Sequence, residues 1–208
     1  MAVLQGSLLD VGVEPSVGPL APGFERLTLS RGAWLDVRRG WLVGADEVFE
    51  TLLTDVPWES ERRQMYDNVV DVPRLARFYT ERETLPHPVL AAARTALSEH
   101  YAGELGEPFL TAGMCLYRDG RDSVAWHGDR FGRGRDLDTM VGILSLGAPR
   151  ALALRPRGGG ESMRVEMASG DLLVMGGSCQ RTWDHAVPKT ARPVGPRMSV
   201  QFRPRAVR

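Results

Sequence analysis

The sequence is poor in cysteine and has no long apolar run, and each shortage excludes a class of protein. Two cysteines in 208 residues, Cys115 and Cys179, cannot build a disulfide framework, and their spacing matches no zinc motif. No apolar run approaches the roughly 20 residues that a membrane-spanning helix needs. The first twenty residues lack the basic start and compact apolar core of a secretion signal. We therefore expect a cytoplasmic protein with reduced thiols and no membrane partner.

Lysine is almost absent too, because Lys189 is the only lysine among 26 basic residues and the others are arginines. The forked guanidinium suits phosphate and carboxylate, but genomic base composition also produces arginine-rich chains, so both explanations stand. The net charge of zero hides an asymmetry: residues 1–104 carry 10 basic and 16 acidic side chains, and residues 105–208 carry 16 and 10. A basic second half is compatible with a polyanionic partner.

The composition that remains, 43% hydrophobic and 25% charged, is that of an ordinary globular domain. Residues 1–20 are interrupted by proline and glycine, and we expect a loose arm there. Residues 25–30 and 33–42 predict short strands. Residues 44–58 and 88–101 predict helices, each with an apolar stripe and with proline at a position that favours a helix boundary.

The chain between the two helices, residues 58–87, is polar and aromatic without a firm period, and we interpret it as a long functional loop or hairpin. After residue 108 the sequence changes to short apolar segments separated by Gly, Pro and Asp turns, which predict eight strands at about 109–118, 123–129, 139–147, 151–157, 162–167, 170–177, 182–187 and 197–205. Such a series favours a sandwich or barrel, of which the jelly roll is the commonest enzymatic form. The sequence thus predicts a mainly β fold with flanking helices (α+β).

The four histidines divide into two pairs. His87 and His100 lie at the start and end of the second predicted helix, where a structural or exposed role is the simplest interpretation. His127 and His185 lie on predicted strand ends, and Asp129 follows His127 in the motif "HGD". A His-x-Asp pair alone is weak evidence, but with a histidine on another strand it forms the two-histidine-one-carboxylate triad that holds non-haem Fe(II).

Two arginines extend this pattern. Arg197 and Arg203 stand six residues apart on the last predicted strand, so alternation places both on one face. Alone, either is most simply a solvated C-terminal residue. Beside an iron triad, the pair would suit a dicarboxylate such as 2-oxoglutarate.

The segments "CLYRDGRDSVAWHGD", "GDLLVMGGSCQRTWDHAVPK" and "PRMSVQFR" resemble the AlkB-type Fe(II)/2-oxoglutarate dioxygenases over roughly residues 58 to 205. The resemblance implies a double-stranded β-helix, or jelly roll, with a catalytic core at residues 108–208. Residues 1–107 would form an N-terminal helical and nucleotide-recognition extension, and the two parts together would form one domain.

The resemblance also implies the site and its cofactors, which are Fe(II), 2-oxoglutarate and O2. His127, Asp129 and His185 would be the catalytic metal ligands. Arg197 would bind the distal carboxylate of 2-oxoglutarate, Arg203 would lie near its keto-acid end, and Tyr117 would touch the cosubstrate.

The reaction implied is oxidative dealkylation of N-alkylated bases in nucleic acid, DNA first and RNA second, releasing formaldehyde, succinate and CO2. We expect a monomer that takes the target base out of the stack. Phe78 and Tyr79 would stack on bases. Phosphates would be contacted by Arg74 and by three arginines of the loop after the His-x-Asp motif, which are Arg130, Arg133 and Arg135. Alternatively, the two aromatic residues pack in the core, and the arginine loop is a solvated turn without a ligand.

Three departures from the family pattern bear on the substrate. Cys115 stands where an asparagine is common, and Ser199 and Gln201 replace an asparagine and a threonine between the paired arginines. Arg130, Phe131 and Gly132 follow the motif where repair members carry acidic residues. This last departure favours the competing hypothesis of a 2-oxoglutarate-dependent hydroxylase acting on a small molecule or protein. A non-catalytic jelly-roll binding module is disfavoured by the complete triad and arginine pair.

Overall fold

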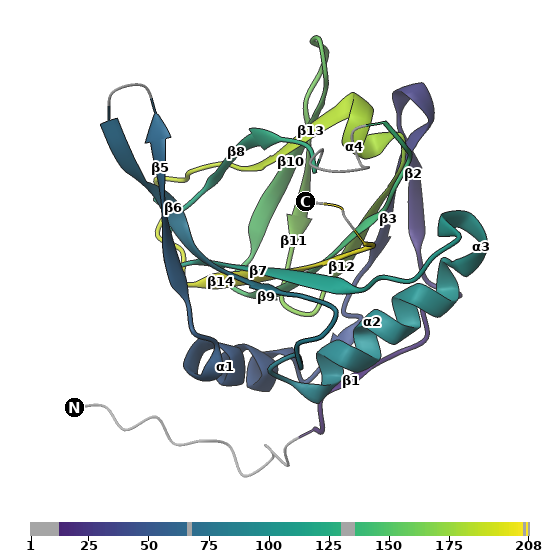
Figure 1. The fold of residues 1–208 in the computed structure, drawn as a ribbon, viewed down its shortest axis with the longest axis horizontal. Coiled ribbons are helices and arrows are strands. Elements are labelled where there is room, and N and C mark those ends of the chain that lie inside the picture. The colour runs from purple at the N-terminus through teal and green to yellow at the C-terminus, as the bar shows by residue number, and fades with distance from the viewer. Residues whose placement is uncertain (1–12, 66–67, 130–135, 206, 208) are drawn as a thin grey trace.

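The computed structural model describes residues 13–65, 68–129, 136–205 and 207, and two antiparallel sheets dominate it (Figure 1). The larger sheet has eight strands in the order β2-β3-β12-β9-β14-β7-β6-β5. Their bounds in that order are Glu25–Thr28, Ala33–Arg38, Leu172–Gly177, Val141–Gly147, Arg197–Arg203, Thr111–Tyr117, Asn68–Tyr79 and Glu59–Met65. Both edges of this sheet therefore come from the N-terminal half of the chain.

The smaller sheet has four strands in the order β11-β10-β13-β8. Their bounds are Met163–Met167, Arg150–Pro156, Trp183–Val187 and Val124–His127. All eight strands predicted after residue 108 are present, and they alternate between the two sheets as the chain advances, except that the consecutive strands β10 and β11 pair within the small sheet. The predicted jelly roll is confirmed.

The large sheet is apolar on both faces because each face covers a separate core. On β9, Leu144 and Leu146 pack against the helices, whereas Val141 and Ile143 pack between the sheets. A strand buried on both faces carries an almost continuous apolar run, as in "VGILSLG". The second core, between the sheets, is the one that also encloses the site.

The two longer helices lie together on the side of the large sheet away from the small one (Figure 1). Helix α1 (Ala45–Asp55) buries Val48, Phe49 and Leu52. Helix α2 (Pro88–His100) begins after His87, whose Nδ1 accepts a hydrogen bond from the Val89 amide at 3.2 Å. Two short helices, α3 (Ala102–Leu105) and α4 (Cys179–Thr182), and the 3-10 turn η1 (Ser30–Gly32) complete the helical elements of the described residues. His87 is thus a helix cap, which confirms its structural interpretation.

The N-terminal segments differ in detail from the expectation. Part of the expected loose arm is ordered, because β1 (Ser16–Val17) pairs with β4 (Leu42–Val43). The strand predicted over 33–42 is two strands, β3 and β4, since the chain turns at Arg39–Gly40, where Gly40 has a φ of 56°. Strands β5 and β6 pair antiparallel, which confirms the hairpin interpretation, and β6 joins them to the large sheet beside β7.

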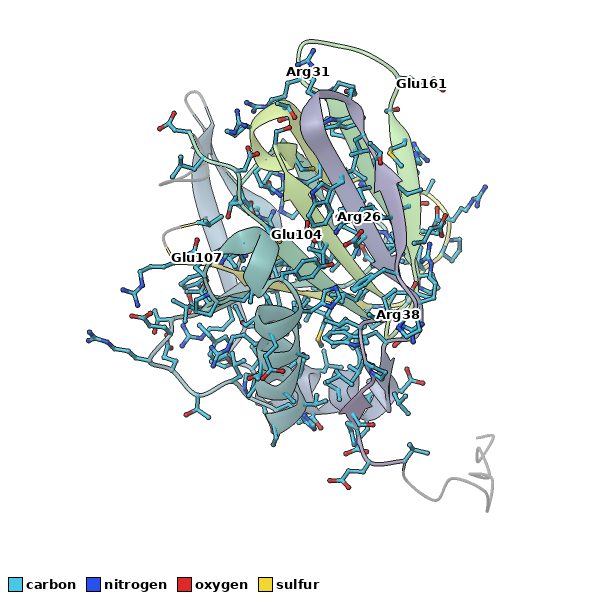
Figure 2. All side chains as sticks on the ribbon, turned by 90° about the vertical axis from the view of Figure 1, so that its right-hand side faces the viewer. Arg26, Arg31, Arg38, Glu104, Glu107 and Glu161 are labelled. Atoms are coloured by element: carbon cyan, nitrogen blue, oxygen red, sulfur yellow. The ribbon has the colours of Figure 1, made fainter. Side chains whose placement is uncertain are left out.

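A buried carboxylate ties the N-terminal strands to the helices. Asp36 on β3 is 1% exposed and accepts two hydrogen bonds from Arg26 and one from the Tyr101 hydroxyl, at 2.7, 2.7 and 2.8 Å. Figure 2 shows Arg26 beside Glu104, with which it also pairs at 3.2 Å. A paired buried charge can be tolerated in a core, so these strands are an integral part of the fold. No helix among the described residues is long and apolar enough to cross a membrane.

Candidate active site

The two histidines of the predicted triad are cross-strand partners. His127 ends β8 and His185 is the central residue of β13, and the antiparallel register places them opposite each other with ring centroids 4.2 Å apart. Asp129 lies two residues beyond His127. One ligand atom from each of the three side chains lies within 4.8 Å of the others. The structure therefore brings all three predicted ligands together, although His185 lies within its strand rather than at its end.

The tautomer of His127 suits metal binding. Its Nδ1 lies 2.8 Å from the carbonyl oxygen of Ala125, and because a carbonyl only accepts, Nδ1 carries the proton. In the neutral form of the ring, Nε2 is then the nitrogen with the free lone pair, and it lies 3.8 Å from Asp129 Oδ1. The hydrogen bond to the strand backbone thus fixes both the ring orientation and the atom available to a metal.

Charge states at the site follow from burial and from one arginine. Burial lowers the pKa of His185 to about 3, so its imidazole is neutral at neutral pH. Burial alone would raise the pKa of Asp129, but the charge of Arg203 outweighs it and holds that pKa at about 2. Two imidazoles and one carboxylate are the donor set that non-haem Fe(II) requires, so the residues present fit this metal.

Arg203 orients the carboxylate. Its Nε donates to Asp129 Oδ2 at 2.7 Å, which leaves Oδ1 directed toward His127. Gly113 on the neighbouring strand makes room for this contact, since a Cβ there would come within 2.8 Å of Arg203 Nη1. Arg203 was predicted to lie near the metal, and the structure places it in direct contact with a candidate ligand.

A cavity of about 80 Å³ opens beside the triad between the two sheets, with room for several water molecules. Arg197 and Arg203 both line it, together with Ser199 and Gln201, because these alternate residues of β14 share one face. The other lining residues come from β6, β7, β8, β9, β10 and β13: Arg74, Cys115, Tyr117, Val124, His127, Ile143, Leu152, His185 and Val187. The volume suits a small cosubstrate rather than a nucleoside.

Arg197 supplies a buried cation that forms no ion pair with the described carboxylates. It is 1% exposed, its Nε donates to Ser145 Oγ at 3.2 Å, and its Nη1 is buried without a hydrogen-bond partner among the described residues. Burial lowers its pKa, which reflects the cost of keeping an uncompensated charge there. A carboxylate bound at Nη1 would remove that cost, so the site fits one end of 2-oxoglutarate.

Tyr117 lies between two guanidinium groups. The Cζ atoms of Arg197 and Arg150 lie 5.1 and 5.8 Å from its ring centroid, and burial raises its pKa to about 12. The phenol is therefore a neutral hydrogen-bond donor at neutral pH. The sequence did not predict a role for Arg150, because it is one arginine among many there. It is buried and donates to the carbonyl oxygens of Asp119, Asp122 and Pro188.

The residues proposed for nucleic-acid contact do not all face the cavities of the site. Arg74 lines the cosubstrate cavity and Phe78 lines a second cavity of about 480 Å³, which shares Cys115 and Gln201 with the first. Tyr79 is on the opposite face of β6, 6% exposed and packed in the helical core. Stacking of Tyr79 on a base is therefore not supported, and the core alternative holds for this residue. Arg130, Arg133 and Arg135 lie outside the described residues.

The position of Arg74 gives a prediction that separates cosubstrate from phosphate binding. Its charge acts on Tyr117 across the cavity. Arg74→Met should therefore raise the KM for 2-oxoglutarate about fivefold, the equivalent of about 1 kcal/mol. Succinate formation measured against 2-oxoglutarate concentration provides the value. Arg77→Met is the matched control for the KM, because Arg77 pairs with Glu83 and does not line the cosubstrate cavity. An unchanged KM together with weaker oligonucleotide binding would show that Arg74 contacts nucleic-acid phosphates rather than 2-oxoglutarate.

Comparisons with known proteins agree with this geometry. A family model described as "2OG-Fe(II) oxygenase superfamily" matches residues 44–203. The protein "Alpha-ketoglutarate-dependent dioxygenase alkB homolog 3" is 32% identical in Bos taurus and 31% in Homo sapiens, each over 204 residues that cover 87% of this chain and 66% of the relative. The chain thus spans slightly less than two thirds of the length of these relatives.

Two further similarities are more distant. "DNA oxidative demethylase ALKBH2" of Homo sapiens is 27% identical over 180 residues, which cover 76% of this chain and 68% of the relative. A solved structure titled "The structure of OsALKBH1" superposes with a TM-score of 0.57 at 15% identity, covering 85% of this chain and all of that one. At this identity the superposition shows a shared fold.

Proposed function

Since the chain belongs to the AlkB-type 2OG-Fe(II) oxygenases, we propose that it is an Fe(II)- and 2-oxoglutarate-dependent dioxygenase that removes alkyl groups from the bases of nucleic acid. One observation carries the proposal: both histidines of the triad line the same cavity as Arg197, whose buried Nη1 has no hydrogen-bond partner among the described residues. The relatives named as a DNA oxidative demethylase and as alkB homologs support nucleic acid as the substrate.

Each residue of the cavity has a distinct part in this function. His127, Asp129 and His185 would hold Fe(II), which with 2-oxoglutarate and O2 supplies the oxidation of an otherwise unreactive C–H bond. Arg197 would hold the distal carboxylate, and the neutral Tyr117 phenol can donate a hydrogen bond to the cosubstrate. Arg203 keeps Asp129 ionised and oriented. The apolar walls, among them Ile143 and Leu152, would limit the access of water to the reacting centre once the cosubstrate fills the cavity.

The second cavity would receive the target base. It lies along β5, β6 and β7, and Phe78 offers an aromatic face there. Cys115 and Gln201 form the wall that it shares with the cosubstrate cavity, so a base held there would present its alkyl group to the metal side. A base reaches such a cavity only after leaving the stack. Oxidation of an N-methyl group would give a hemiaminal, which releases formaldehyde and restores the native base.

A second candidate is a 2-oxoglutarate-dependent hydroxylase of a small molecule or protein. The sequence after Asp129, Arg130-Phe131-Gly132, favours it because the acidic residues of repair members are missing there. Both candidates use the same metal and cosubstrate residues. They differ only in whether 2-oxoglutarate turnover is coupled to a methylated oligonucleotide.

The test is incubation of the Fe(II)-loaded protein with N-methylated DNA and RNA oligonucleotides, single- and double-stranded, followed by mass spectrometry. We expect loss of the methyl group from at least one oligonucleotide, with one succinate formed per base restored. Asp129→Ala provides the background. Turnover of 2-oxoglutarate without restoration of any base would contradict the proposal and favour the hydroxylase.

A salt titration tests phosphate contacts by the loop arginines. Phosphate binding releases counterions, and each contact adds roughly one unit to the slope of log K against log salt. Charge reversal at Arg130, Arg133 and Arg135 should therefore weaken oligonucleotide binding and flatten that slope by up to about three units. Fluorescence anisotropy at several salt concentrations measures both quantities.

The matched control changes the net charge equally at another surface. Arg164, Lys189 and Arg192 line an outer cavity and are exposed. Charge reversal of these three residues should leave most of the slope in place. Equal flattening in the two triple variants would show a general charge effect and would remove the loop arginines from the contact surface.

A further inference from the structure

Of the three candidate metal ligands, Asp129 has the least support from regular structure. His127 and His185 belong to paired strands, whose ladder fixes both backbones. Asp129 lies beyond the end of β8 and belongs to no strand. Its side chain is fixed by Arg203, which leaves open what fixes its main chain.

The main chain of Asp129 is held by Gln180. The Asp129 amide donates to Gln180 Oε1 at 2.9 Å, in a hydrogen bond that joins residues 51 positions apart. Gln180 is 1% exposed and Asp129 is 4% exposed, so water does not compete for this bond. A buried amide without an acceptor is costly, and no acceptor other than Gln180 is recorded for this amide within the described chain.

Gln180 is itself anchored. It lies on α4, where the amides of Arg181 and Thr182 donate to the Ser178 carbonyl at 2.9 Å. Ser178 in turn donates its hydroxyl to the Arg31 carbonyl at 2.6 Å. The Gln180 amide nitrogen lies 3.7 Å from Met175 Sδ on β12. The acceptor therefore stands on a segment tied to the large sheet.

The same short helix leads directly into the strand that carries the second histidine. Helix α4 ends at Thr182 and β13 begins at Trp183, two residues before His185. Gln180 thus joins the segment of one ligand to the segment of another. A displacement of Asp129 by a fraction of an ångström would separate its Oδ1 from the position facing His127 Nε2.

We propose that Gln180 is a positioning residue of the metal site, which sets the place of the Asp129 carboxylate through its main chain. The inference rests on the proposed metal-dependent function. Groups that orient metal ligands from outside the coordination sphere commonly change metal affinity by 10- to 100-fold when removed. A merely structural role would change the stability of the fold and leave metal affinity in place.

The experiment measures the Mn(II) dissociation constant of the full chain by calorimetry, and thermal unfolding of the metal-free protein alongside. Gln180→Leu keeps the apolar packing and removes the acceptor, so we expect Mn(II) binding about 10-fold weaker or more. Gln180→Glu keeps an oxygen at the same distance along the side chain, so it should restore most of the affinity. Met175→Leu, which alters the other contact of the amide, should stay within about twofold of wild type.

The outcomes separate this inference from the function on which it rests. Mn(II) binding by Gln180→Leu equal to wild type, with or without a lower Tm, would overturn the positioning role alone. A wild-type chain that binds no metal would overturn the proposed function and this role together. If Gln180→Leu does not fold, Gln180→Asn, whose amide is one methylene shorter, gives the same comparison with the same criterion.

Discussion

Replacement of any one of the three metal-ligand candidates by alanine should reduce 2-oxoglutarate turnover to background. His127, Asp129 and His185 supply the whole donor set, and the described residues show no other His, Cys, Asp or Glu grouped with them. Succinate formation with saturating Fe(II) measures the loss. Stabilisation by metal should disappear as well, since a ligand that binds only the folded state raises Tm by an amount that grows with the logarithm of its affinity.

The metal-free forms of these variants should unfold cooperatively, as we also expect of the wild type. His185→Ala removes a buried ring, so a lower Tm is expected for it and does not count against the assignment. His100→Ala is the matched control, because His100 contacts Phe24 and Tyr101 at the end of α2, outside the cavity. Wild-type turnover in any of the three ligand variants would remove that residue from the metal site.

The second large effect is expected at Arg197. Its Nη1 is buried and has no hydrogen-bond partner in the part of the chain that the structure describes, and a hydrogen bond between a guanidinium and a carboxylate contributes about 1.5–3 kcal/mol. Arg197→Ala should therefore raise the KM for 2-oxoglutarate by about 10- to 150-fold. Oligonucleotide affinity should change little. Steady-state succinate formation and anisotropy measure the two quantities separately.

Arg157 offers a control of the same residue type. It follows β10 and pairs with Asp184, the residue before His185, without lining the cavity. Arg157→Ala should leave the KM for 2-oxoglutarate close to wild type. An Arg197→Ala variant with an unchanged KM and weakened oligonucleotide binding would place Arg197 on the nucleic-acid surface.

Much of the site could be predicted because its residues follow local patterns. His127 and Asp129 are fixed by a two-residue spacing, and Arg197 and Arg203 share a face because strand side chains alternate. The same rule could have corrected one error. Phe78 and Tyr79 are adjacent on a strand, so they cannot both face the same cavity, and the structure shows Tyr79 in the helical core.

The remaining residues depend on contacts between distant segments. Gln180 meets Asp129 across 51 positions, and Arg150 meets Tyr117 through the packing of two sheets. Nothing in their immediate neighbours distinguishes them from ordinary polar residues. The ordered β1 was missed for the same reason, because two residues become a strand only through their partner β4.

A crystal structure with Mn(II) and 2-oxoglutarate, without O2 turnover, tests the central claim most directly. We expect an anomalous manganese peak in contact with His127 Nε2, Asp129 Oδ1 and the His185 ring, and one carboxylate of 2-oxoglutarate against Arg197 Nη1. Manganese bound elsewhere, or 2-oxoglutarate away from Arg197, would contradict the account.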